Sequence, residues 1–136
     1  MSTQRWVLDA SAAVSLVMRQ PDAHLFLTAL EQSERVFVPH LYFAECTNAL
    51  WKYVSHQFLD LDTAVSRLEE LMALPDEVIQ EQNLMLEALS LASQTKHPVY
   101  DAIYLVLARR YAAGLLSKDK RLIQLATQLG INILAI

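Results

Sequence analysis

The sequence predicts an α/β fold in which a short parallel sheet of four to five strands lies between two layers of helices. Short apolar runs alternate with longer segments of helical periodicity, which is the pattern of β-α-β crossovers. The 2 glycines and 4 prolines fall between these segments rather than inside them. With 136 residues, of which 54% are hydrophobic, the chain can bury a core without metal ions or disulfides. We therefore expect one three-layer α/β/α domain over residues 1–136.

The first half of the chain alternates strand and helix up to Pro75. Residues 5–9 form a short apolar run that ends in a carboxylate, and residues 11–18 behind them have helical spacing until Pro21. The segments that follow are expected to be a helix at 22–34, a strand at 36–38 and helices at 40–56 and 61–74. Pro75 ends the last of these helices.

The second half continues the alternation. We expect a strand at 77–80, helices at 83–95 and 100–113, a strand at 115–117, a helix at 119–129 and a terminal strand at 131–136. Pro98, Gly114 and Gly130 separate these segments. Ligands of such sheets bind beyond the carboxyl ends of the strands, where the strand order reverses. The residues to inspect are therefore Asp9 and those that follow Leu116.

Composition excludes several classes of protein. The net charge of −4, from 11 basic and 15 acidic residues, argues against a uniformly basic nucleic-acid-binding surface. Neither a G-x-G-x-x-G nor a P-loop motif is present, which excludes the common nucleotide-binding loops. Cys46 is the only cysteine, the chain opens without a secretory signal, and no apolar run is long enough to span a bilayer. These features favour a cytoplasmic protein.

Two acids are expected next to strands. Asp9 ends the first strand and Asp119 opens the last helix just after another strand, and either carboxylate could serve simply as a helix N-cap. Asp101 lies in the first helical turn after Pro98, where a carboxylate interacts favourably with the helix dipole. Each acid therefore also has an ordinary structural explanation.

Glu45 is less easily explained by local structure. It lies in the middle of a helix whose neighbouring residues are largely apolar. An ionised carboxylate in such surroundings costs several kcal/mol unless a cation or hydrogen-bond donors compensate it. Asn48, three residues further on, lies on the same helix face and could supply a donor or orient the carboxylate. A half-exposed glutamate at the edge of the helix face is the alternative.

Taken together, Asp9, Glu45, Asp101 and Asp119 indicate a shared acidic pocket. Four converging carboxylates would repel one another, so such a pocket is physically reasonable only around a hard divalent cation. Ligation by oxygen alone favours Mg²⁺ or Mn²⁺, and no spacing of Cys and His residues offers a zinc site.

Four stretches of the chain resemble the PIN-domain family, and within it the VapC-type toxins of toxin–antitoxin pairs. They are VLDASAAV with Asp9 and Ser11, PHLYFAECTNALWK with Glu45, Asn48 and Leu50, VYDAIYLVLAR with Asp101, Tyr104 and Ala108, and LLSKDKRL with Ser117, Asp119 and Leu122. The resemblance extends over nearly the whole chain. Many relatives have Thr where this chain has Ser117, and the hydroxyl group is kept.

The resemblance implies a function and a site. Asp9, Glu45, Asp101 and Asp119 would be the metal-binding and catalytic acids, with Ser11 and Ser117 as accessory hydroxyls. Members of the family cleave RNA with Mg²⁺ or Mn²⁺, form dimers and are inhibited by a cognate antitoxin. A bound metal would lower the pKa of the attacking water and offset charge on the phosphate. Asp9 and Asp101 are the expected direct ligands, and the sequence leaves open whether one ion or two are used.

Other segments suggest contacts with partners. Lys118, Lys120 and Arg121 flank Asp119 and could bind backbone phosphates, although a solvated helix face would carry the same charges. Residues 41–91 are rich in large apolar side chains, more than a small core needs. We expect part of this surface to form a homodimer interface and part to receive an amphipathic antitoxin helix.

Two other readings remain. One is a catalytically silent PIN-like module that binds a partner without cleaving RNA. The other is a phosphoryl-transfer enzyme or receiver domain, which also places an Asp after an early parallel strand. Ser11 stands where the D-x-D phosphatases need an acid, and Asp9 is flanked by Leu8 and Ala10 where receivers usually pair acids, so the sequence disfavours this class.

Overall fold

The computed structural model describes residues 4–134, and these contain one parallel sheet. Its strands are β1 (Gln4–Leu8), β2 (Ser33–Pro39), β3 (Glu77–Ile79) and β4 (Gly114–Leu116), in the order β3-β2-β1-β4. All three strand pairs are parallel. The predicted α/β class with a short parallel sheet is therefore confirmed, with four strands.

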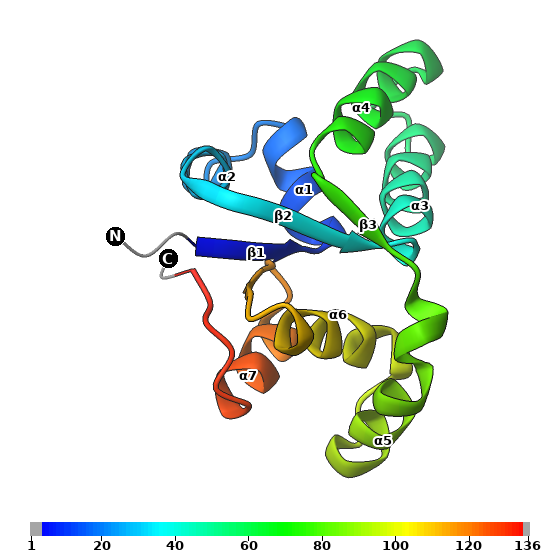
Figure 1. Ribbon diagram of the computed structural model, residues 1–136. Coiled ribbons are helices and arrows are strands. Elements are labelled where there is room, and N and C mark those ends of the chain that lie inside the picture. Colours follow the sequence, from blue (N-terminus) through cyan, green and yellow to red (C-terminus); the bar gives the residue numbers. More distant parts are fainter. Residues whose placement is uncertain (1–3, 135–136) are drawn as a thin grey trace.

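Helices connect the strands and cover both faces of the sheet (Figure 1). They are α1 (Ala10–Val17), α2 (Ala23–Glu31), α3 (Leu41–Ser55), α4 (Leu61–Ala73), the short 3₁₀ helix η1 (Glu81–Leu84), α5 (Met85–Thr95), α6 (Val99–Arg110) and α7 (Lys120–Gln128). Helices α1 to α4 lie on one side of the sheet and α5 to α7 on the other. None of the helices in residues 4–134 is both long and apolar enough to cross a membrane.

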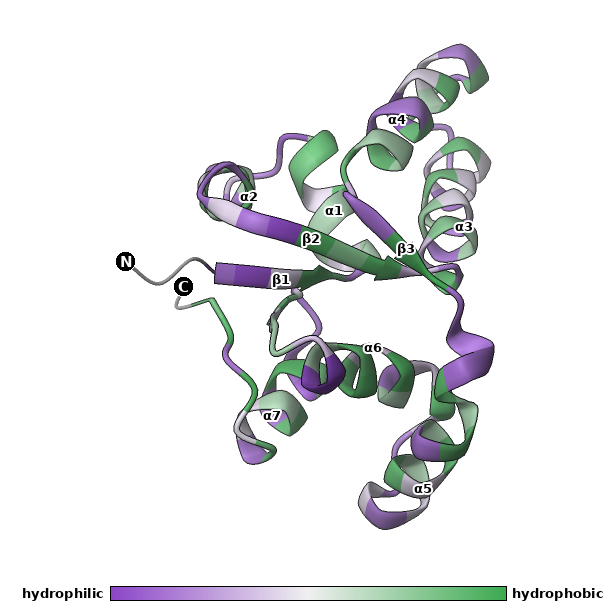
Figure 2. Cartoon of the chain, viewed as in Figure 1, coloured by the Kyte–Doolittle hydropathy of each residue, from purple (hydrophilic) through white to green (hydrophobic). Residues whose placement is uncertain are grey.

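The alternation of side chains along the strands creates two hydrophobic cores. In β1, Trp6 and Leu8 face the core under α1 to α4, whereas Val7 faces the core under α5 to α7. In β2, Val38 faces the core under α1 to α4, whereas Phe37 faces the core under α5 to α7. Figure 2 shows that β1 and β2 begin hydrophilic and become hydrophobic toward their carboxyl ends. The sheet is thus buried on both faces at the end where the predicted site lies.

The strand order reverses between β1 and β4. The chain moves from β1 to β2 and β3 on one side, and β4 then pairs with the other edge of β1. Beyond the aligned ends of these strands, the backbone N–H of Asp9 donates to the carbonyl oxygen of Leu116 at 3.1 Å. Asp9 and the loop after Leu116 therefore meet at the switch point, where open α/β sheets bind their ligands.

Four segments differ from the sequence prediction by three or more residues. The strand expected at 36–38 already begins at Ser33. The helix expected at 22–34 ends at Glu31, because Ser33 and Glu34 already belong to β2. The helix expected at 100–113 ends at Arg110, and Ala112 has a positive φ of 50°. The terminal strand expected at 131–136 is reduced to a single bridge between Ile133 and Leu115, and residues 135–136 lie outside the described part.

Candidate active site

Asp9 is a buried carboxylate at the junction of β1 and α1, with only 6% of its surface exposed. Its Oδ1 accepts hydrogen bonds from Ser11 Oγ at 2.7 Å and from the backbone N–H of Ala12 at 3.1 Å, so it caps the helix. Its Oδ2 accepts a 2.6 Å bond from Ser117 Oγ. Burial raises the pKa of Asp9 above its ordinary value, and these three bonds offset part of that increase.

Ser11 and Ser117 connect the first turn of α1 with the loop that follows β4. Their hydroxyl oxygens are 3.3 Å apart. Ser11 Oγ accepts the backbone N–H of Lys118 at 2.9 Å, and Ser117 Oγ accepts that of Asp119 at 3.0 Å. The two hydroxyls thus hold the start of α1 and the loop after β4 around the carboxylate of Asp9.

Glu45 projects from the middle of α3 and is half-buried. Tyr104 of α6 donates a 2.5 Å hydrogen bond to its Oε1. Burial raises the pKa of Glu45, the Tyr104 bond lowers it, and the charges of Asp9 and Asp101 raise it further. Asn48 makes no hydrogen bond to Glu45 within residues 4–134, so the partner of this carboxylate is Tyr104.

Asp101 and Asp119 approach the site from α6 and α7. Asp101 lies in the first turn of α6, and its Oδ2 is 3.5 Å from Nη2 of Arg121. Asp119 caps α7: its Oδ1 accepts the backbone N–H groups of Arg121 at 2.9 Å and Leu122 at 3.2 Å. Both acids therefore also fill the local structural roles that the sequence offered for them.

The four acids influence one another electrostatically. The charge of Asp119 raises the pKa of Asp9, and the charges of Asp9 and Asp101 raise that of Glu45. Across residues 4–134, however, no three His, Cys, Asp or Glu side chains stand in an arrangement that could hold a metal ion. Asp101 is instead paired with Arg121. The donors are all carboxylate oxygens, which is the chemistry that Mg²⁺ and Mn²⁺ favour.

A groove of about 720 Å³ lies beside α3, and Glu45 is the one of the four acids that lines it. Ser11 and Glu45 line one part of it, and Lys52, His56 and Phe58 also line it. The remaining lining residues come from α1, the α1–α2 turn, α3 and the loop after β4: Ala10, Val14, Ser15, Gln20, Asn48, Ala49, Tyr53 and Lys118. A groove of this size falls within the range that ligand sites occupy, about 300–1,000 Å³.

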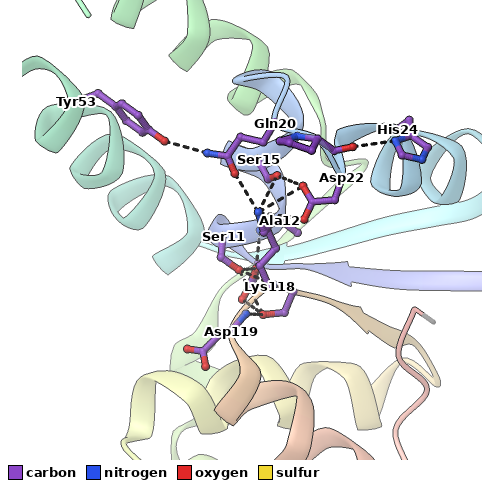
Figure 3. Close-up of polar contacts among 12 residues, drawn as sticks. Ser11, Ala12, Ser15, Gln20, Asp22, His24, Tyr53, Lys118 and Asp119 are labelled. Atoms are coloured by element: carbon purple, nitrogen blue, oxygen red, sulfur yellow. Dashed lines mark hydrogen bonds and ion pairs between the residues drawn. The ribbon is translucent and has the colours of Figure 1, made fainter. Parts of the chain in front are cut away.

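Lys118 lies at the wall of this groove in a polar network (Figure 3). Its Nζ is 3.0 Å from Asp22 Oδ2 and donates to Gln20 Oε1 at 2.9 Å. A 2.6 Å bond from Ser15 Oγ and the Lys118 ammonium lower the pKa of Asp22. Lys120 and Arg121, the other two predicted phosphate contacts, are exposed on α7.

Two features of the site were not predicted from the sequence. Tyr104 was part of the resemblance, but its contact with Glu45 was not predicted. Its spacing of three residues after Asp101 places both on one face of α6, and this could have indicated a shared site. The second feature is the groove itself, because its walls come from segments that are far apart in the sequence.

Comparisons with known proteins agree with this architecture. A PIN domain family model matches residues 6–128. The chain is 30% identical over 118 residues to Ribonuclease VapC3 from Pyrobaculum aerophilum, which covers 85% of this chain and 90% of that protein. It also resembles the crystal structure of PAE2754 from Pyrobaculum aerophilum, with a TM-score of 0.70 and 23% identity over 89% of this chain and 78% of the other. This chain therefore belongs to the PIN-domain family and is of the VapC type.

Proposed function

We propose that the protein is a Mg²⁺- or Mn²⁺-dependent endoribonuclease and the toxin of a type II toxin–antitoxin pair. The PIN-domain match and the similarity to a VapC ribonuclease support a VapC-like nuclease toxin. In this proposal the chain is one catalytic domain and acts in the cytoplasm, where Cys46 stays reduced.

The observation that carries the proposal is the burial of Asp9 at the switch point of the sheet. A carboxylate that is only 6% exposed is unfavourable in its charged form, and burial raises its pKa accordingly. Glu45 has a raised pKa for the same reason, and neighbouring acids add to both. Within the described residues neither Asp9 nor Glu45 has a cationic partner, and a divalent cation would supply one.

The residues fit such an ion by their chemistry. Asp9 and Asp101 would bind it directly, and Glu45 and Asp119 would bind it directly or through water. When bound, Mg²⁺ or Mn²⁺ lowers the pKa of water and offsets negative charge on the phosphate oxygens.

The chain's own groups orient the acids. Ser11 and Ser117 hold the two oxygens of Asp9 in place, since each donates to a different one. Tyr104 donates to Oε1 of Glu45, which leaves Oε2 to accept the proton of the attacking water.

Partners follow from the proposal. The substrate is RNA, with Lys118, Lys120 and Arg121 near its backbone, and a cognate antitoxin inhibits the enzyme. Exposed apolar side chains on α4 and α5, such as Leu61 and Leu86, are available for a homodimer interface and an antitoxin helix.

Cleavage of RNA by the purified protein tests the function. We expect Mn²⁺ or Mg²⁺ to support cleavage, EDTA to stop it, and both Glu45→Gln and Asp101→Asn to abolish it with the fold intact. Full activity of either variant would refute the site. The catalytically silent module would instead show no saturable Mn²⁺ binding at millimolar concentration and no cleavage, while still binding its protein partner.

A further inference from the structure

The end of α3 presents two aromatic rings at the groove. His56 and Phe58 both line it, and their ring planes are within 15° of parallel with centroids 6.4 Å apart. Phe58 is 74% exposed, which is unusual for so large an apolar side chain beside a turn. The proposed catalytic site does not use either residue.

The turn that carries these rings is fastened by backbone hydrogen bonds. The N–H of Phe58 donates to the carbonyl of Tyr53 at 2.9 Å, and that of Gln57 donates to the carbonyl of Val54 at 3.0 Å. This is the Schellman arrangement, in which the apolar residue at the position of Phe58 usually packs back onto the helix. Here Gln57 adopts the left-handed conformation with φ of 63°, a position where glycine is common. The turn thus holds Phe58 outward in a defined position.

His56 is also fixed in orientation. Its Nδ1 lies 2.8 Å from the carbonyl oxygen of Lys52, and because a carbonyl only accepts, Nδ1 carries the proton. The Nε2 atom is left without a partner within the described residues. Two nearly parallel rings on a hydrogen-bonded turn form a platform suited to a planar ligand.

The platform is continuous with the acidic site. Glu45, Asn48, Lys52 and His56 follow one another on a single face of α3, and all four line the same groove. The 11 residue steps from Glu45 to His56 span about 16.5 Å at a rise of 1.5 Å per residue. Stacked nucleotides repeat at about 3.4 Å, so this distance corresponds to several nucleotides.

The charges along the groove change from one end to the other. Glu45 is its only acidic lining residue within residues 4–134, and Lys52 stands one turn before His56. Lys52 makes no ion pair in the described part of the chain, whereas Lys118 is engaged by Asp22. A cation beside stacked aromatic rings is the combination by which proteins bind single-stranded nucleic acid.

We propose that His56 and Phe58 stack a base of single-stranded RNA several nucleotides from the cleaved bond, while Lys52 binds an adjacent phosphate. This inference rests on the proposed ribonuclease function and places the bound strand along α3. A duplex cannot offer an isolated base face to the platform, so duplex RNA is a poor substrate.

Fluorescence anisotropy tests the platform without cleavage. The probe is a fluorescein-labelled oligouridine of ten nucleotides, and the buffer contains EDTA so that no RNA is cleaved. Binding is measured for the intact protein and for the variants Phe58→Leu, Phe58→Trp, His56→Ala and Lys52→Ala. We expect Phe58→Leu and His56→Ala to weaken binding about five- to tenfold, and Phe58→Trp to bind like the unchanged protein because it keeps an aromatic face. Lys52→Ala should make the decrease of log affinity with the logarithm of salt concentration shallower by about 0.7. His24→Ala removes an exposed histidine outside the groove and should change nothing.

The outcomes separate this inference from the proposed function. If Phe58→Leu binds oligouridine like the unchanged protein, the platform is refuted, even if RNA is cleaved in Mn²⁺. If that variant instead alters self-association in sedimentation and leaves RNA binding intact, the face is a protein interface and the inference fails. If affinity depends on Phe58 but no RNA is cleaved, the RNA platform stands and the nuclease proposal falls. In an active enzyme, Phe58→Leu should raise KM with little change in kcat.

Discussion

Ser117 donates a 2.6 Å hydrogen bond to Oδ2 of Asp9, although the two residues are 108 positions apart in the sequence. This bond connects the loops after β4 and β1 at the point where the strand order reverses. It also opposes the increase in the pKa of Asp9 that burial causes. The orientation of the proposed catalytic acid therefore depends on a contact that forms only in the folded chain.

Removing that hydroxyl should destabilise the protein. Ser117→Ala leaves a buried carboxylate with one donor fewer, which should raise the pKa of Asp9 further and lower the free energy of unfolding by about 1–3 kcal/mol. Ser117→Thr keeps the hydroxyl and is the matched control, with stability within about 1 kcal/mol of the unchanged protein. Urea unfolding at pH 7.5 measures both, and equal losses in the two variants would show that the hydroxyl is unimportant.

Asp9→Asn should stabilise the protein when no metal is present. The substitution removes a charge that burial disfavours and keeps an N-cap for α1, so we expect a gain of about 1–2 kcal/mol in EDTA together with loss of RNA cleavage. Asp60→Asn is the control, since Asp60 caps α4 at an exposed position. Asp60→Asn should leave both stability and cleavage close to their original values. If Asp60→Asn stabilises the protein and Asp9→Asn does not, the buried charge of Asp9 is not what destabilises the metal-free fold.

Metal-free stability should fall as the pH rises above about 4. Asp9 and Glu45 have raised pKa values in the folded state, so between the ordinary carboxyl pKa of about 4 and those raised values the folded state binds more protons than the unfolded state. The free energy of unfolding then decreases with pH over this window. Asp22 and Glu87 have lowered pKa values, so their opposite contributions lie below about pH 4.

Thermal unfolding in EDTA at pH 5.0 and pH 7.5 checks this sign. We expect the higher melting temperature at pH 5.0, and a smaller difference for Asp9→Asn. A melting temperature that rises from pH 5.0 to 7.5 would show that these two acids do not dominate the pH dependence.

Tyr104 should act as a positioning residue for Glu45. Tyr104→Phe keeps the buried ring and removes the 2.5 Å hydrogen bond to Oε1, so the fold should persist while the pKa of Glu45 rises. We expect kcat to fall about tenfold, as is common when the partner of an active-site acid is lost, and the acidic limb of the pH–rate profile to move to higher pH. Loss of rate with an unchanged pH profile would indicate a purely structural role.

The sequence allowed the alternation of strands and helices to be predicted, and with it the placement of Asp9 and Asp119 just after strands, because apolar runs, prolines and glycines are local signals. The end of α2 was missed because Ser33 and Arg35 pair with Gln4 and Arg5 of β1 in the sheet, and such pairing overrides local helical spacing. The contact between Tyr104 and Glu45 joins two helices, and the Lys118 network joins two distant loops. Contacts of this kind depend on packing between elements, which a single sequence does not encode locally.

The central claim is that Asp9, Glu45, Asp101 and Asp119 form one divalent-metal site, and a crystal soaked in millimolar Mn²⁺ tests it most directly. The account predicts an anomalous peak bonded to carboxylate oxygens of Asp9 and Asp101, with Asp101 turned away from Arg121 and Glu45 close to the ion or to its water. Ordered side chains with no Mn²⁺ peak at Asp9, and Asp101 still paired with Arg121, would contradict it.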